Sequence, residues 1–364
     1  MTIKDIEIMQ NRTNFTPWVS FCIATYRRPN ILKDTLHYIS QQSFSDFEVI
    51  VSDNDPTQSS RCVVEEFNDK RFLYFSNSEN VGMVKNFNIA LKNAHGDFVV
   101  MIADDDPPRI DFLQTMHALW QDWPNYGAYF GACEVIIASE DAAAAYQVNM
   151  GPIKFLADAP EDTIRCFSRE QFPGEFFELK VFPYTLWSTG IVRRDIATCI
   201  GGMPDYGSAL LTDLSYVAVV GSYAGCVTIN KVMGGQIVHG ANSGLVSPHD
   251  VELALKGCHK YLNEHLSGRD DWLSLEGRVE KFLATYIVKH CIAMRVHFSR
   301  NGNKVELEKL HRTLKRMFVL QGMEKMYFYY IRAQLIDKAK FILRPITPIL
   351  KYMYALFKSN GACS

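Results

Sequence analysis

Three consecutive carboxylates stand at residues 104–106, where they end the apolar run 98–103 and directly precede Pro107 and Pro108. Adjacent negative charges repel one another, and burying them without a counter-charge costs free energy. A hard divalent cation, which prefers oxygen ligands, would remove that cost, and a metal held here could in turn hold a phosphate. The alternative is a solvated acidic turn between the apolar run and the two prolines.

The run before the three acids is one of several short apolar segments with strand character. The first four cover residues 18–24, 47–52, 71–75 and 98–103, and helical periodicity separates them. The first helical pattern starts at Asn30, which we expect to be its N-cap. Regular alternation of strands and helices predicts a mostly parallel sheet with helices on both faces. Further strands are expected at residues 126–130, 133–138, 187–194 and 224–230.

Polar clusters follow three of the predicted strands, at residues 25–28, 53–55 and 104–106. In open parallel sheets, ligands bind at the carboxyl ends of the strands, so we expect these clusters to form one site. Neither a GxGxxG nor a GxxxxGK[ST] motif occurs at these turns, and a glycine-rich phosphate cradle is therefore not predicted. A phosphate bound there would instead be neutralised by a metal and by cationic side chains.

Composition limits the classes of function. A length of 364 residues with 48% hydrophobic residues suits one large domain with an appendage, or two domains. The formal net charge of -2 argues against nucleic acid as the main partner. Nine cysteines without a CxxC pair predict neither a zinc site nor a disulfide framework, so reduced thiols in the cytosol are expected.

The beginning of the chain, residues 1–16, is a polar leader that lacks the apolar core of a secretory signal. No run approaches the roughly 18 apolar residues that a membrane-spanning helix needs. We therefore expect a soluble or peripheral protein, located in the cytoplasm or at the inner face of the cell membrane.

From residue 250 onward, long helical patterns replace the alternation of strand and helix, which predicts a helical appendage. Between Lys304 and Lys358, basic residues are mixed with aromatic and aliphatic residues at helical spacing. This mixture is typical of a segment that lies on an anionic membrane surface. It fits equally well a helical bundle or a dimer face with a solvated basic side.

Residues 18–245 resemble the metal-dependent family 2 glycosyltransferases of the GT-A fold, of the kind that build bacterial surface polysaccharides. The resemblance rests on the order and spacing of four motifs, which are Thr25-Tyr26-Arg27-Arg28-Pro29, Val51-Ser52-Asp53-Asn54, Asn80-x-Gly82-x-x-x-Asn86 and the three acids. It implies an α/β fold with a Rossmann-like, mostly parallel central sheet. The domains would be the leader at 1–16, a nucleotide-sugar-binding catalytic domain at 17–245, and the helical region at 246–364.

The resemblance also implies roles in binding a nucleotide donor. Asp53 would accept a hydrogen bond from the base, and Asp104 would contact the ribose. Asp105 would ligate Mg²⁺ or Mn²⁺ on the diphosphate, with Asp106 as a second or outer ligand. The other donor-site candidates are Thr25, Tyr26, Arg28, Gly82 and Asn86. The alternative for Asp53 is an Asx-turn after a strand.

The candidate general base is Asp213. In the family, a Gly-Gly turn precedes an acidic pair, usually Glu-Asp, at the start of a helix, and the Asp is the base. Here Thr212 replaces the Glu, and Asp213 keeps the position of the base. A carboxylate suits this task, because an acceptor hydroxyl must lose its proton as it attacks. The alternative is that Asp213 and Thr212 only cap the helix, in which case Asp205 is the second candidate for the base.

Two further positions follow from the resemblance. In several relatives, a His before a small, Ser-containing loop supplies the last metal ligand, and His239 has that place. An imidazole among oxygen ligands is tolerated better by Mn²⁺ than by Mg²⁺, although a lone His can also be structural. Many relatives have Asn where Arg27 stands, which leaves the role of that position open.

These residues predict an inverting, metal-dependent glycosyltransferase that moves a sugar from a nucleotide-diphosphate donor to an acceptor hydroxyl. The acceptor would be a lipid-linked or growing surface polysaccharide, and an anionic membrane surface is a further expected partner, whereas nucleic acid is not. One alternative is a sugar-phosphate nucleotidyltransferase, which normally opens with a Gly-rich basic loop that is missing here. The other is a non-catalytic, membrane-associated binding protein on the same scaffold, with Thr212 as a sign of decay.

Overall fold

The structure is a computed structural model that describes residues 16–138, 140, 151–181, 187–238, 247–300, 302–319 and 335. The chain divides into two compact units, Met1–Leu275 and Glu276–Ser364. The first unit contains the whole central sheet and the residues that the sequence singles out, apart from the basic segment near the C-terminus.

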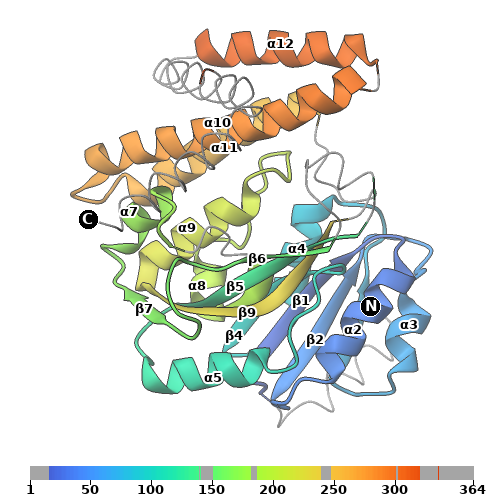
Figure 1. The fold of residues 1–364 in the computed structure, drawn as a ribbon. Coiled ribbons are helices and arrows are strands. Elements are labelled where there is room, and N and C mark those ends of the chain that lie inside the picture. The colour runs from blue at the N-terminus through green and yellow to red at the C-terminus, as the bar shows by residue number, and fades with distance from the viewer. Residues whose placement is uncertain are drawn as a thin grey trace, which may run out of the picture. The chain divides into compact units, whose positions relative to one another are not determined.

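The central sheet has nine strands in the order β3-β2-β1-β4-β8-β5-β9-β7, and β6 pairs with β5 (Figure 1). The strands are β1 Val19–Thr25, β2 Phe47–Asp53, β3 Phe72–Ser76, β4 Phe98–Ala103, β5 Ala128–Ile137, β6 Gly151–Phe155, β7 Ile164–Phe167, β8 Gly190–Arg193 and β9 Cys226–Val238. Strands β1 to β4 are parallel to their neighbours in this group, while β8 runs antiparallel between β4 and β5. The predicted α/β fold with a mostly parallel sheet is confirmed.

The register of the parallel strands brings the polar clusters to one edge. Thr25 at the end of β1 is paired with Asp53 at the end of β2, and Ala24 is paired with Ala103 at the end of β4. All seven residues of β1 and all seven of β2 are buried, as expected for parallel strands covered on both faces. The three acids that follow β4 therefore lie at the same edge as the residues that follow β1 and β2.

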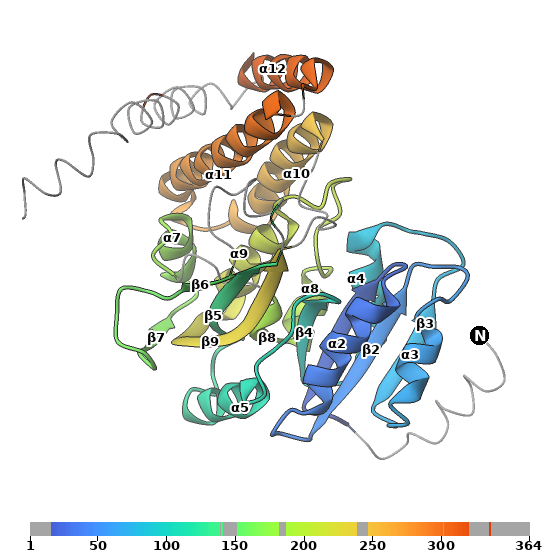
Figure 2. The same ribbon diagram turned by 45° about the vertical axis from the view of Figure 1, so that its right-hand side comes forward.

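Helices cover both faces of this sheet. On one face, α2 Pro29–Ser40, α3 Arg61–Glu66 and α5 Phe112–Asp122 pack against every second residue of the strands, including Val19, Phe21 and Ile23 of β1. Figures 1 and 2 show α2 and α3 beside each other over the blue strands. Helix α4, Met83–Lys92, contacts β1 and β2 and does not share this core, so it covers the other face.

The structure differs from the expected elements at several places. The strand expected at 224–230 runs on to Val238 as β9, and residues 187–189 of the strand expected at 187–194 form a 3₁₀ turn before β8. The two strands expected between residues 126 and 138 form the single strand β5, and a shift of its register with β9 falls between Gly131 and Cys133, where a break was expected. The expected N-cap of α2, Asn30, lies inside the helix, because Pro29 starts it and Arg28 is the N-cap. Proline suits the first helical position, since its fixed φ is helical and it has no N–H to leave unpaired there.

The remaining elements complete the first unit and form the second. In the first, the structure has α7 Phe172–Phe177, a 3₁₀ turn at Trp187–Thr189, α8 Arg194–Cys199, α9 Thr212–Ala224 and α10 Pro248–Leu266. Helix α11, Trp272–Arg300, crosses the division between the units, and α12 is Lys304–Val319. The predicted change from alternating elements to long helices is confirmed. The predicted domain boundary at 245/246 stays a prediction, and the first compact unit continues through α10.

The segment beyond α12 lies outside the described residues, except for residue 335, so its predicted membrane or partner contact stays a prediction. Among the helices that the structure describes, none combines the length and the apolar composition needed to cross a membrane.

Candidate functional site

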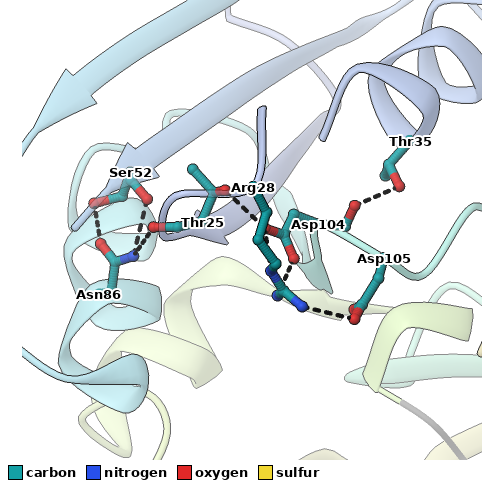
Figure 3. A network of polar contacts seen from close by, with 7 residues as sticks. All are labelled: Thr25, Arg28, Thr35, Ser52, Asn86, Asp104 and Asp105. Carbon is teal, nitrogen blue, oxygen red and sulfur yellow. Dashed lines mark hydrogen bonds and ion pairs between the residues drawn. The ribbon is translucent and has the colours of Figure 1, made fainter. Parts of the chain in front are cut away.

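Arg28 lies at the centre of the site, where it binds two of the three acids (Figure 3). Its Nε donates to Oδ2 of Asp104 at 3.1 Å, and its Nη2 donates to Oδ1 of the same carboxylate. Its Nη1 donates to Oδ2 of Asp105 at 3.0 Å. A planar guanidinium matches a carboxylate in this two-pronged way, so the contact fixes orientation as well as charge.

The last residue of β1 and helix α2 hold Asp104 from two further directions. The Thr25 hydroxyl donates to Oδ2 of Asp104 at 2.7 Å, and the Thr35 hydroxyl donates to its backbone carbonyl at 2.7 Å. Asp104 is fully buried. Its predicted ribose contact stays a prediction, and in the present structure both carboxylate oxygens accept hydrogen bonds from the protein.

Burial and mutual repulsion act on the acids in the same direction. Burial raises the pKa of Asp104 to about 6, although Arg28 and Thr25 oppose that rise. Burial, and then the charge of Asp105, raise the pKa of Asp106 well above its ordinary value. One guanidinium thus faces three neighbouring carboxyl groups, and a further cation would favour their ionised forms.

The donor set suits a divalent cation. Asp105 and Asp106 are only 7% and 5% exposed, and their oxygens are the hard ligands that Mg²⁺ and Mn²⁺ accept. Magnesium is commonly bound by one or two carboxylates together with substrate phosphates and water, so this pair fits such an ion. Within the described ranges, no group of three or more His, Cys, Asp or Glu side chains is arranged to hold a metal. The predicted ligand His239 lies outside those ranges.

Asp53 makes the Asx-turn that the sequence left as its alternative role. Its carboxylate accepts from the backbone N–H of Asp55 at 2.8 Å, from that of Ser60 at 3.3 Å and from the hydroxyl of Tyr74 at 2.8 Å. A carboxylate offers about four acceptor positions, so most of them are used inside the protein. Its contact with a nucleotide base stays a prediction, and the structure shows what holds the group in place.

Asn86, from the first half of α4, fastens the ends of two strands. Its Nδ2 donates to the carbonyls of Thr25 at 3.2 Å and Ser52 at 2.9 Å, and its Oδ1 accepts from the Ser52 hydroxyl at 2.6 Å (Figure 3). The Asn86 Oδ1 also accepts from Nδ2 of Asn77 at 2.8 Å. All four hydrogen-bonding positions of an asparagine amide are thus used. The sequence could not reveal this role, because Thr25 and Ser52 lie 61 and 34 residues away.

Gly82 precedes α4 with φ +90° and ψ 160°, a conformation open essentially only to glycine. The Asn54 amide donates to its carbonyl at 3.1 Å, which connects the loop after β2 to the start of the helix.

The side chains at Tyr26 and Arg27 lie at the surface, and Tyr26 is 38% exposed. Arg27 has φ +55°, a positive value that is uncommon for a residue other than glycine and in which asparagine is enriched.

Asp213 lies in the first turn of α9, one residue after the helix begins. Burial raises its pKa, and the backbone N–H of Leu214, which donates to Oδ1 at 2.8 Å, opposes this effect. The N-cap of α9 is Leu211, and no side chain makes a capping hydrogen bond there. The Thr212 hydroxyl instead donates back to the carbonyl of Ala209 at 2.8 Å. Neither residue is the N-cap, but the Asp213 carboxylate accepts a backbone N–H within the first turn of α9, so its role as base and the capping alternative both stay predictions.

The second candidate for the base, Asp205, lies in the loop that leads to α9. Its carboxylate accepts from the backbone N–H of Gly207 at 3.1 Å and lies 3.9 Å from Nζ of Lys85.

Sequence reasoning missed Thr35, Tyr74 and Asn77 as members of the site's hydrogen-bond network. Only their polar type could have indicated them, because their partners come from distant parts of the chain.

Comparisons with known proteins find glycosyltransferases. Residues 20–168 match the model of the family described as glycosyl transferase family 2. A Campylobacter jejuni GalNAc(5)-diNAcBac-PP-undecaprenol beta-1,3-glucosyltransferase is 30% identical over 45% of this chain, and the match spans 51% of that enzyme. A Salmonella typhimurium abequosyltransferase is 34% identical over 27% of this chain and is matched over 31% of its own length. The alignments thus span about half of the first relative and about a third of the second.

Solved structures show the same fold. TarS of Staphylococcus aureus, in complex with UDP-GlcNAc, superposes with a TM-score of 0.50 at 15% identity, and the match covers 82% of this chain and 91% of that one. The mannosyltransferase PcManGT of Pyrobaculum calidifontis, in complex with GDP-Man and Mn²⁺, superposes with a TM-score of 0.50 at 17% identity over 88% and 87% of the two chains. Residues 20–168 are therefore similar to glycosyl transferase family 2, and the chain shares the GT-A fold of these two solved glycosyltransferases.

Proposed function

We propose that this protein is an inverting, metal-dependent glycosyltransferase that moves a sugar from a nucleoside-diphosphate donor to an acceptor hydroxyl. The acceptor is a lipid-linked or growing surface polysaccharide, handled at the cytoplasmic side of the membrane. The observation that carries the proposal is the acidic cluster at the end of β4, because it places buried, mutually repelling carboxylates at the ligand-binding edge of a GT-A sheet.

Asp105 and Asp106 would hold the divalent cation, with His239 as a further candidate ligand, and that cation would stabilise the charge on the leaving diphosphate. Arg28 adds a second positive charge at the same place, and its contacts with Asp104 and Asp105 fix where that charge stands. Thr25 and Asn86 keep the ends of β1 and β2 at fixed positions beside it. A preorganised site of this kind needs little rearrangement when charge develops on the leaving group.

Asp213 would take the proton of the acceptor hydroxyl as that oxygen attacks the anomeric carbon from the face opposite the leaving group. Its raised pKa supports this role, because a carboxylate with a higher pKa is a stronger base. As long as that pKa stays below the working pH, the carboxylate is also still ionised and able to accept the proton. Attack from the opposite face gives inversion at the anomeric carbon.

The relatives support this assignment over the two alternatives. The named relatives are a glucosyltransferase and an abequosyltransferase, and the first of them carries an undecaprenol-linked acceptor in its name. No observation favours a nucleotidyltransferase or a non-catalytic binding protein. The replacement of the usual Glu by Thr212 is compatible with catalysis, since the Thr212 hydroxyl closes the turn in front of the base.

A donor screen tests the proposal. The purified chain is incubated with a panel of UDP- and GDP-sugars, with Mn²⁺ or Mg²⁺, and the released nucleoside diphosphate is measured with and without lipid-linked acceptors. We expect release from one donor, loss of that release with EDTA, and loss of it in Asp213→Asn, which still binds nucleotide. Asp69→Asn, at an ion pair with Arg71 outside the site, is the matched control and retains activity. Release that is the same with and without EDTA would remove the metal from the proposal.

A further inference from the structure

Helix α4 contacts a second part of the site besides the strand ends. Asn88, two residues after Asn86, donates from Nδ2 to the backbone carbonyl of Met203 at 2.8 Å. Its Oδ1 accepts from the backbone N–H of the same residue at 2.9 Å. Two hydrogen bonds to one backbone residue fix its orientation as well as its position. We call this pair of bonds the Asn88–Met203 contact.

The backbone at residues 202 and 203 allows the Asn88 side chain to come close. Met203 is 1% exposed, and the preceding Gly202 has φ +75°. A Cβ at Gly202 would lie 2.3 Å from Oδ1 of Asn88, which is closer than a carbon and an oxygen can stand. Glycine therefore meets two requirements here, a left-handed backbone and room for the Asn88 amide.

Met203 belongs to the loop that leads from α8 to Asp213. Further along this loop, the Tyr206 hydroxyl donates to the carbonyl of Leu210 at 3.0 Å. Leu211 then takes the left-handed conformation, with φ +70°, immediately before α9 begins. A non-glycine residue stays in that conformation only where its surroundings hold it, and Leu211 is 1% exposed. The loop is thus held at several points, and a shift of Met203 would be passed to the first turn of α9.

The same helix is fixed on the donor side. Asn86 binds the ends of β1 and β2, and Asn88 lies only two residues further along α4, which is about half a helical turn and too short a stretch to bend between the two contacts. We propose that Asn88 is a positioning residue for Asp213, because it ties the loop in front of the base to the helix that holds the donor side of the site. This inference rests on the proposed function, since it assigns Asn88 a part in the same reaction.

Asn88→Ala removes both hydrogen bonds of the contact and leaves the donor-side contacts of Asn86 unchanged. Misplacement of a reacting group by about 1 Å can cost about 100-fold in rate, so we expect kcat to fall about 10- to 100-fold. The KM for the donor and the Kd for the nucleoside diphosphate, measured by calorimetry, should stay within about two-fold, because the donor is held by residues on the other side of α4.

Asn93→Ala is the matched control. Asn93 ends the same helix, and its Nδ2 donates to the carbonyl of Ile89 at 2.8 Å, so this variant loses a hydrogen bond within α4 but none to the loop. We expect it to lower Tm as Asn88→Ala does while kcat stays unchanged.

A second test of the contact is Gly202→Ala, whose methyl group displaces the Asn88 amide. Its effect on kcat should be smaller in the Asn88→Ala background than in the wild type.

Asn88→Asp serves if Asn88→Ala does not fold, because aspartate keeps the acceptor for the Met203 N–H and loses only the donor. The inference is overturned if a folded Asn88 variant keeps the kcat of the wild type, or if nucleotide affinity falls as much as kcat. A wild type that turns over no donor contradicts the proposed function itself. An active wild type with an equally active Asn88→Ala contradicts only the role of Asn88.

Discussion

At the scale of single residues, the site depends on how charge is arranged around Arg28. The side chain of Arg28 is 28% exposed, whereas the Asp104 carboxylate that it binds is fully buried. Burying an ionised carboxylate without a partner costs free energy. The main contribution of the Arg28–Asp104 ion pair to stability is therefore that it avoids this penalty. The sequence predicts all three acids and Arg28 as site residues, but it does not predict that they bind one another, because the partners lie 76 and 77 residues apart.

Arg28→Ala should lower the free energy of unfolding by about 2 kcal/mol, because it leaves Asp104 buried beside Asp105 without a counter-charge, and partial exposure of Arg28 moderates the effect. Asp104→Asn in the same chain should restore part of the loss, since it removes the unpaired charge. Urea unfolding of the two single variants and the double variant measures the coupling. Strictly additive effects would show that the pair does not matter for stability.

Asp213 should determine how activity depends on pH in the acid range. Its folded pKa is raised above the ordinary value of 3.8, and the base works only when ionised, so kcat/KM should fall as pH decreases through that raised pKa. The sign is opposite for stability: the protonated carboxyl is favoured in the fold, so this group's contribution to stability is present at low pH and is lost as pH rises through the raised pKa. A rate profile measured against pH checks the first statement. An acid limb at or below 3.8 would contradict it.

At the scale of elements, the strands and helices up to β4 follow from the sequence, because apolar runs and helical periodicity alternate there without interruption. The strands β1, β2 and β4 begin within one residue of the expected positions. The pattern fails at β5, where an irregularity in strand pairing looks like a gap between two strands. The sequence pattern also does not predict that α4 contacts both the strand ends and the loop before α9. Asn86 binds the strand ends and Asn88 binds the loop, and these partners are distant from α4 in sequence.

Gly82→Ala should destabilise the start of α4, even though no atom lies within 4 Å of where its Cβ would stand. The cause is the backbone conformation, and we expect a cost of about 1–3 kcal/mol in unfolding free energy together with weaker nucleotide binding. Gly277→Ala is the control, because Gly277 lies within α11, where the added Cβ also meets no atom. There alanine should stabilise the helix by about 0.5–1 kcal/mol. Equal effects at both glycines, measured by denaturant unfolding, would refute this explanation.

At the scale of the whole molecule, the alternation of strand and helix and the long helical patterns after residue 250 correctly predict an α/β protein with a helical region toward the C-terminus. The net charge of -2 conceals an uneven distribution, because the acids gather at the end of β4 while basic residues concentrate toward the C-terminus. Composition alone cannot predict a donor site, since that site depends on the register that brings three strand ends to one edge. The family motifs supply that information, because their order and spacing belong to this one topology.

The central claim is that the acids after β4 bind a divalent cation and, through it, a nucleoside diphosphate. The most direct measurement is calorimetric titration of UDP and GDP into the full chain, with Mn²⁺ and with EDTA, for the wild type and for Asp105→Asn. We predict that one of the two nucleotides binds with Mn²⁺, that EDTA weakens this binding at least about 10-fold, and that Asp105→Asn weakens it similarly. Binding that is equally tight with EDTA, or unchanged in Asp105→Asn, would contradict the claim.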